Sequence, residues 1–237
     1  MRFSSPLVFG TLVKRYKRFL ADIRMSDGSI VTVHCPNSGA MAGLLAEGNR
    51  VGLSRSTNPN RKLPFTWEIV EADMGGVRQW VGVHAARANA IFRDALESGA
   101  VPAFSGYKHI RPEFPYGLGS RVDFLLTAPD KPEAYVEIKN CHMMRASGLA
   151  EFPDSVSTRG AKHMRELAAV AAGGKRAAVV YIVQMSAEGF RVAADMDPAY
   201  DAEFRGAVAG GVEAYAFTCR VSPDDISVEK GIPVLLR

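Results

Sequence analysis

The sequence predicts two domains, an all-β barrel over residues 1–82 followed by an α/β domain over residues 83–237. Three observations support this division. Short β patterns separated by turn residues fill about the first 80 residues. Apolar residues recur at helical spacing from about residue 84 onward. The charge is also uneven, because residues 1–62 hold ten Lys or Arg against three Asp or Glu, or +7, in a chain whose net charge is +4.

The N-terminal part contains five short β patterns. Turn residues such as Ser26, Asp27 and Gly28 separate them, and alternation of apolar and polar residues is typical of half-buried strands. The expected strands cover residues 18–25, 29–35, 50–55, 65–71 and 79–84, with a helical piece over 41–46 between the second and third. Such a set is typical of a small closed barrel of the oligonucleotide-binding (OB) type, a fold that binds nucleic acid, sugars or other proteins.

The C-terminal part alternates helices with strands. An amphipathic helix of about 14 residues ends at Ser98 and Gly99. It is followed by strands over 107–113, 121–127 and 134–140, a helix over 158–172, a strand over 177–184, a helix over 198–210 and a strand over 214–221. The continuous apolar run 177–184 is typical of a central strand that is covered on both faces. This order predicts an α/β unit with three consecutive strands between its first two helices.

Composition argues against a membrane protein and favours the cytoplasm. The chain is 47% apolar and 23% charged. Its longest apolar runs have about seven or eight residues, far short of the roughly 18 that span a bilayer. Pro6 and Gly10 interrupt the N-terminal apolar stretch, and no small-residue cleavage site follows, so a secretory signal is not expected. Three cysteines make an odd number, which argues against a disulfide framework and fits a reducing cytoplasm.

The excess positive charge gathers in one stripe, Lys14-Arg15-Tyr16-Lys17-Arg18. Cations attract a phosphate backbone, and aromatic rings can stack on unpaired bases, so the stripe predicts a nucleic-acid surface. The alternative is a solvated strand edge that is basic in order to discourage aggregation. The turn around Asn37 could add an amide side chain and backbone N–H groups to a ligand, although a plain connecting loop explains it equally well.

Two neighbouring strands carry a candidate active site. Alternation places Glu137 and Lys139 on one face of their strand and Ile138 on the other. Asp123 lies in the preceding strand, and its carboxylate can lie beside that of Glu137 if the two strands pair. Two converging carboxylates favour Mg²⁺ or Mn²⁺, which would polarise a phosphodiester while Lys139 orients a water or holds negative charge. The alternative is a salt-bridged pair on an edge strand.

The helix over 158–172 supplies two further candidates. If its start approaches the strand ends, Lys162 could bind phosphate and His163 could assist proton transfer or position a base. The alternative is a helix whose polar face is simply solvated. Glu97, on the first helix, is a weaker candidate for an additional metal ligand.

Five blocks follow one another over nearly the whole chain: residues 12–22 (LVKRYKRFLAD), 34–41 (HCPNSGAM), 120–124 (SRVDF), 136–140 (VEIKN) and 152–160 (FPDSVSTRG). They resemble the blocks of the bacterial and archaeal sugar fermentation stimulation protein A family. The resemblance implies an OB barrel followed by a domain similar to the PD-(D/E)xK nuclease superfamily, DNA binding, and a regulatory part in sugar catabolism. By that resemblance Asp123, Glu137 and Lys139 match the superfamily's catalytic positions, whereas Val122 stands where its motif has a proline.

Three hypotheses follow. The first is a cytoplasmic DNA-binding protein whose basic barrel holds DNA at a Mg²⁺-dependent, nuclease-like site on the second domain. The second is a DNA-binding regulator of sugar catabolism that breaks no bond. The third is a binder of carbohydrate or another small ligand. The absence of a helix-turn-helix motif disfavours a site-specific repressor, and the sequence leaves the oligomeric state open.

Overall fold

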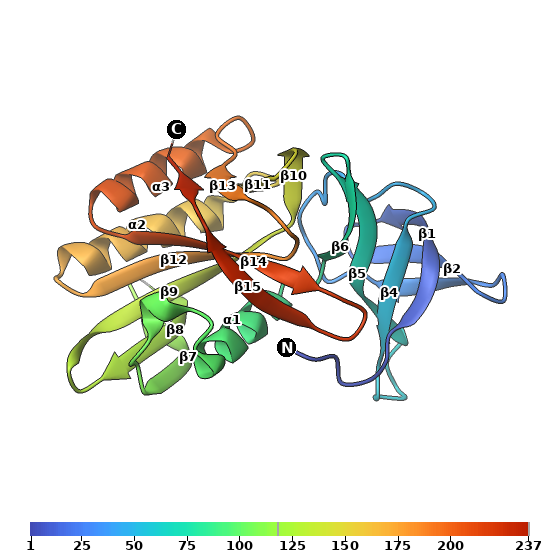
Figure 1. Ribbon diagram of the computed structural model, residues 1–237, viewed down its shortest axis with the longest axis horizontal. Helices are drawn as coiled ribbons and strands as arrows, with labels where there is room; N and C mark the ends of the chain where they lie inside the picture. Colours follow the sequence, from blue (N-terminus) through green and yellow to red (C-terminus); the bar gives the residue numbers. More distant parts are fainter. Residues whose placement is uncertain (118, 237) are drawn as a thin grey trace.

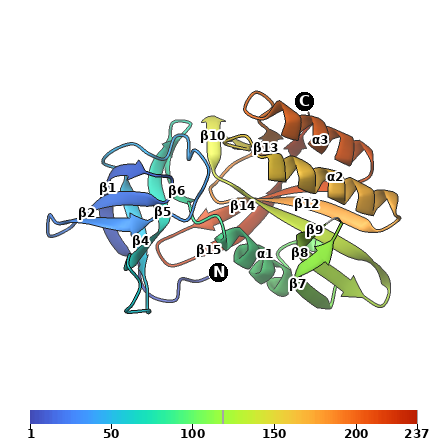
Figure 2. The same ribbon diagram turned by 180° about the vertical axis from the view of Figure 1, so that it is seen from behind.

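The computed structural model describes residues 1–117 and 119–236 and contains the two predicted parts side by side (Figure 1). A β barrel, coloured blue to teal, lies next to an α/β domain built on a central sheet. Two long helices pack on one face of that sheet and a third packs on the other, as the view from behind also shows (Figure 2). The predicted architecture, an OB barrel followed by an α/β domain, is confirmed.

Six strands build the barrel region: β1 (Val8–Tyr16), β2 (Leu20–Met25), β3 (Ile30–His34), β4 (Arg50–Arg55), β5 (Phe65–Met74) and β6 (Val77–Gly82). The order β3-β2-β1-β4-β5 closes on itself, because His34 of β3 pairs in parallel with Thr66 of β5. Leu12, Ile23 and Trp67 fill the interior and are at most 1% exposed. This closed five-stranded barrel is the OB architecture, and β6 extends it by pairing with β5.

Two details of the barrel prediction were wrong. The strand expected over 18–25 begins at Leu20, and β1 precedes it, because Lys17 and Arg18 lie in the turn between them with φ angles of 49° and 60°. The helical piece expected over 41–46 is instead a series of turns. Met41 and Leu44 are buried there, and the Leu44 N–H donates to the Met41 carbonyl at 3.1 Å. Met41 and Leu44 are therefore three residues apart because they pack within one turn of the chain, not within a helix.

The α/β domain has a six-stranded sheet in the order β15-β14-β12-β9-β8-β7. Its elements are α1 (Arg87–Ser98), η1 (Pro102–Phe104), β7 (His109–Tyr116), β8 (Ser120–Ala128), β9 (Lys131–Cys141), α2 (Thr158–Ala172), β12 (Arg176–Val183), α3 (Pro198–Ala209), β14 (Glu213–Val221) and β15 (Ile226–Ile232). Strands β9, β12 and β14 are parallel, and the other three are antiparallel to their neighbours. The helix predicted over 158–172 has those bounds because Ser157 caps its start and Gly173 ends it.

A second, four-stranded sheet was not predicted. It has the order β10-β11-β13-β16 and consists of β10 (Met143–Ala146), β11 (Leu149–Phe152), β13 (Gly189–Val192) and β16 (Val234–Leu235). None of these strands exceeds four residues, which is too short for alternation to be recognised. The edge strand β15 was also missed. Within the described part of the chain, no helix is long and apolar enough to cross a membrane.

The two domains contact each other closely. The Gly82 N–H at the end of β6 donates to the Gln184 carbonyl after β12 at 2.8 Å. A Cβ at Gly82 would lie 2.0 Å from Gln184 Oε1, so only glycine allows this approach. Glu68 of β5 also binds Arg87 at the start of α1, with Oε1 2.8 Å from Nη2. The barrel is therefore held in a defined position on the α/β domain.

Candidate active site

Asp123 lies where strands β8 and β9 cease to pair. The ladder between them ends at Phe124 and Val136. Beyond this last pair, the Ile138 N–H of β9 donates to Asp123 Oδ2 at 2.7 Å, so the carboxylate replaces the backbone carbonyl that a continued ladder would supply. Asn89 of α1 donates to Asp123 Oδ1 at 2.8 Å. Asp123 is thus fixed in the opening between the two strands, at the backbone of the residue that follows Glu137.

Glu137 lies on the α2 side of β9 with Lys139, and Ile138 packs on the α1 side, as alternation predicts. Glu137 Oε1 accepts from Lys139 Nζ at 2.7 Å and makes a very short contact with His163 Nδ1 of α2. Glu137 Oε2 is buried, and no atom of residues 1–117 or 119–236 forms a hydrogen bond with it. The structure therefore brings Glu137, Lys139 and His163 into contact, places Asp123 near enough to Glu137 for their charges to interact, and leaves Glu137 Oε2 available to a ligand.

The two carboxyl groups differ in their electrostatics. Burial, together with the nearby charge of Glu137, raises the pKa of Asp123 to about 6, although the bonds from Ile138 and Asn89 act in the opposite direction. Burial alone would raise the pKa of Glu137 as well, but Lys139 and His163 hold that pKa below its ordinary value. The pair thus carries repulsion that a further positive charge would relieve.

Sequence reasoning missed several residues around this pair. Ser120 donates to Glu166 Oε1 at 2.8 Å, and the buried Tyr116 hydroxyl lies close enough to Glu166 for the two groups to interact. Burial and the charges of Glu137, Glu166 and Asp123 raise the pKa of Tyr116. Asn89, which holds Asp123, was also missed. A sequence signal exists for Ser120, which opens the block 120–124 that carries the family resemblance. The roles of Tyr116, Glu166 and Asn89 follow instead from contacts that only the folded chain forms.

Lys162 and His163 occupy different environments on α2. His163 is 5% exposed and contacts Glu137, whereas Lys162 is exposed, with its Nζ 3.5 Å from Glu166 Oε1. Both line a cavity of about 320 Å³ together with Ser120, Arg121 and Arg159. Glu97 lies elsewhere, in a cavity lined by Met1, Arg2 and Asp94 near the other end of α1. The α1 residue that reaches Asp123 is Asn89.

The donor set fits a hydrated divalent cation. Among the described residues, no three His, Cys, Asp or Glu side chains lie close enough together to enclose a metal ion. Mg²⁺, however, usually binds through one or two carboxylates and keeps several waters. The unpartnered Glu137 Oε2 and the repulsion between Asp123 and Glu137 are what such a cation would satisfy.

The predicted basic stripe divides into two kinds of residue. The Arg15 guanidinium donates to the carbonyls of Arg18, Asn37 and Ala40, at 2.8, 2.8 and 3.4 Å. The Tyr16 hydroxyl donates to Asp22 at 3.0 Å, and Lys14 Nζ lies 3.7 Å from the same carboxylate while 65% of its side chain stays exposed. Arg15 and Tyr16 therefore also support the barrel itself.

The tip of the β1–β2 hairpin is the exposed part of the stripe. Lys17, Arg18 and Phe19 form its turn, and the Phe19 side chain is 47% exposed. Two consecutive non-glycine residues with positive φ are uncommon. The turn therefore exposes two cations, Lys17 and Arg18, and the aromatic ring of Phe19 to solvent.

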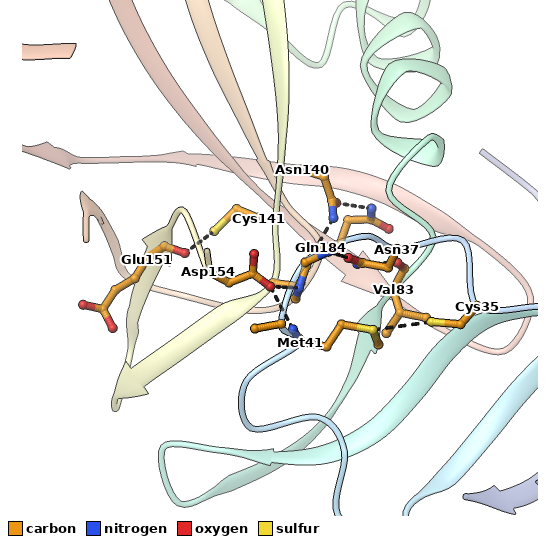
Figure 3. Close-up of polar contacts among 12 residues, drawn as sticks. Cys35, Asn37, Met41, Val83, Asn140, Cys141, Glu151, Asp154 and Gln184 are labelled. Atoms are coloured by element: carbon orange, nitrogen blue, oxygen red, sulfur yellow. Dashed lines mark hydrogen bonds and ion pairs between the residues drawn. The ribbon is translucent and has the colours of Figure 1, made fainter. Parts of the chain in front are cut away.

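Asn37 does not present its side chain to solvent, in contrast to the expectation for a ligand contact. It is 3% exposed, and its amide donates to the Val83 carbonyl at 2.8 Å while accepting from the Gly39 N–H at 2.9 Å. The same loop is bound to the α/β domain, because Asp154 accepts from the Met41 N–H at 2.8 Å and contacts His142 (Figure 3). Asn37 thus belongs to the joint between the domains.

Comparisons with known proteins agree with each other over both domains. Residues 86–225 match the model described as the sugar fermentation stimulation protein RE domain, and residues 13–83 match the SfsA N-terminal OB domain. A sugar fermentation stimulation protein homologue from Methylobacterium radiotolerans is 55% identical and covers 99% of both chains. A homologue from Methylorubrum populi is 53% identical over 99% of this chain and 95% of its own. A Pyrococcus furiosus SfsA structure, solved in complex with Ca²⁺, has a TM-score of 0.86 and 25% identity over 99% of this chain and 98% of its own.

Proposed function

The chain belongs to the sugar fermentation stimulation protein family, and from this premise we propose that it is a DNA-binding protein with a divalent-cation-dependent, nuclease-like phosphodiesterase site. One observation carries the proposal. Asp123 lies in the strand opening next to a Glu137 whose Oε2 is buried without a partner. A carboxylate in that state is expected where a ligand completes the site. The Ca²⁺ complex of the Pyrococcus furiosus relative supports a divalent cation as that ligand.

Asp123 and Glu137 would hold Mg²⁺ or Mn²⁺, which would supply Lewis-acid polarisation of a phosphodiester and a more acidic bound water. Lys139 lies 2.7 Å from Glu137 Oε1 and adds a positive charge on the same face of β9. His163 orients Glu137 from the α2 side. Lys162 and Arg159, at the mouth of the neighbouring cavity, are suited to bind the phosphate oxygens of the substrate.

The barrel would hold the DNA. Lys17, Arg18 and Phe19 at the hairpin tip, with the exposed Lys14, offer positive charge and a stacking surface. Arg15 would act through the loop that it binds, because its guanidinium donates to three backbone carbonyls.

A second function, DNA binding without cleavage as a regulator of sugar catabolism, is favoured by one observation. Each oxygen of Asp123 already accepts a hydrogen bond, and Lys139 is ion-paired with Glu137. These contacts by themselves could stabilise the strand opening without any chemistry.

A cleavage experiment separates the two functions. The purified protein is incubated with end-labelled single- and double-stranded DNA and Mg²⁺ or Mn²⁺, beside Lys139→Ala. Lys230→Ala is the matched control, because that lysine is an exposed partner of Glu188 on the far edge strand β15. We expect products from the wild type and from Lys230→Ala that Lys139→Ala does not form. Binding that weakens steeply with salt, together with equal or absent products in all three, would leave only the regulator.

A further inference from the structure

Glu113 has a strained backbone opposite Asp123. Its φ is 50°, in the left-handed region that non-glycine residues seldom adopt. Pro112, before it, pairs with Phe124 of β8, and Phe114, after it, pairs with Val122. The β8 residue opposite Glu113 is therefore Asp123. The conformation turns the Glu113 carbonyl toward Arg121, which donates to it at 3.4 Å.

Nothing in the packing of the Glu113 side chain explains this strain. The side chain is exposed, and none of the hydrogen bonds and ion pairs recorded for the described residues involves its carboxylate. A glycine would adopt the same φ without cost. Backbone strain that no packing or hydrogen bond of the side chain explains is most often found beside functional sites.

Glu113 lines two cavities beside the candidate active site. One, of about 290 Å³, is lined by Glu113 with Asp123, Asn89 and Arg93. The other, of about 320 Å³, is lined by Glu113 with Arg159 and His163. Glu113 therefore shares one cavity with Asp123 and the other with His163, the histidine that contacts Glu137.

We propose that Glu113 is a third acidic residue of the candidate cation site, where it holds water molecules of a hydrated divalent cation bound by Asp123 and Glu137. This inference rests on the proposed function. The buried, unpartnered Glu137 Oε2 independently indicates a missing ligand. No three acidic or histidine side chains of the described residues meet closely enough for direct ligation, so the contribution of Glu113 goes through water.

Calorimetric titration of the full chain with CaCl₂, after removal of metal by a chelator, tests the proposal without relying on cleavage. Glu113→Gln keeps the backbone strain and removes the charge, so we expect the Ca²⁺ affinity to fall about tenfold. Glu113→Gly removes both, so the same loss of affinity should accompany a rise of about 2 °C in the metal-free thermal midpoint. Glu229→Gln is the matched control, because Glu229 is exposed on the opposite edge strand β15 and should behave as wild type.

The outcomes are distinguishable. Wild-type Ca²⁺ binding that both Glu113 variants leave unchanged overturns the inference and spares the proposed function. A Glu113→Gly variant that loses affinity and also melts earlier overturns the inference, because the residue is then structural. An equal loss in Glu229→Gln overturns it too, because the effect is then one of net charge. Absence of Ca²⁺ binding by the wild type removes the cation site itself, and the inference with it.

Discussion

Glu68 and Glu137 are both buried strand carboxylates beside a histidine and a basic side chain, yet only Glu68 has partners for both oxygens. At the joint between the domains, Glu68 Oε1 accepts from Ser54 and Arg87, and Oε2 accepts from Arg87 and lies 2.9 Å from His84 Nδ1. At the candidate site, Glu137 Oε1 takes both contacts and Oε2 has none.

The difference separates a structural carboxylate from one that awaits a ligand. Burial of a charge is costly unless every lone pair is satisfied. Glu68 meets that condition within the protein, and its partners come from β4, the segment that follows β6 and the start of α1, so it stabilises the joint. Glu137 does not meet it, and it also repels Asp123. Residues that break a local rule in this way are expected at functional sites.

The largest expected effect is on the stability of the joint. Glu68→Gln removes one partner of a buried ion pair and should lower the free energy of unfolding by about 3 to 5 kcal/mol. Urea unfolding followed by circular dichroism measures this. Glu71→Gln, in the same strand but in a half-exposed pair with Arg78, is the control and should cost less than about 1 kcal/mol. Equal losses in the two variants would mean that Glu68 is not a special contact.

The pH dependence of stability should follow Glu68. Burial alone would raise its pKa, but the bonds from His84, Arg87 and Ser54 lower it from 4.5 to about 2. A carboxyl with a lowered pKa in the folded state contributes stability that is fully present above the unfolded-state pKa and is lost as pH falls toward 2. Between pH 5 and pH 2 the wild type should therefore lose about 3 kcal/mol more than Glu68→Gln. Parallel stability curves for the two proteins would contradict the assignment.

Glu137→Gln should change stability much less and function much more. Loss of the bonds that Glu137 Oε1 accepts leaves the largely buried Lys139 ammonium without its carboxylate partner. Relief of the repulsion between Glu137 and Asp123 offsets part of that cost, so we expect the free energy of unfolding to fall by about 1 to 2 kcal/mol. Ca²⁺ binding should fall below detection in calorimetry, because the substitution removes a proposed ligand. A stability loss as large as that of Glu68→Gln, with Ca²⁺ binding intact, would make Glu137 a second structural carboxylate.

The smallest effect on stability is expected at the hairpin tip. There the exposed cations Lys17 and Arg18 contrast with Arg15, whose guanidinium is hydrogen-bonded within the barrel. Charge reversal in Lys17→Glu/Arg18→Glu should change the free energy of unfolding by less than about 0.5 kcal/mol, because both side chains are exposed. It should nevertheless weaken DNA binding at least about tenfold at low salt, measured by fluorescence anisotropy. Arg15→Ala, which leaves three carbonyls without their donor, should instead cost about 1 to 2 kcal/mol of stability. Unchanged DNA affinity in the tip variant would place the contact surface elsewhere.

Much of the fold and part of the site could be predicted from the sequence, for local reasons. The bounds of α2 follow from its cap at Ser157 and from Gly173, and the shared face of Glu137 and Lys139 follows from the two-residue period of a strand. The bend at Lys17 and Arg18 could not be predicted, because neither is a residue type that favours positive φ. The sheet β10-β11-β13-β16 was also not predicted, because β11, β13 and β16 are short strands that pair with partners distant in the chain.

The sequence by itself determined the order of the three helices and of the longer central strands, the candidate acids and the basic stripe, because alternation, capping and charge depend on a few neighbouring residues. Only the tertiary structure decided that Asp123 enters the opening between β8 and β9, that Asn37 is buried at the joint between the domains, and that Glu113 lies opposite Asp123 on the neighbouring strand. It also decided that both oxygens of Glu68 have hydrogen-bond partners, whereas Glu137 Oε2 has none among the described residues. These properties depend on burial and on partners from other elements, and no local pattern records where those partners will lie once the chain has folded.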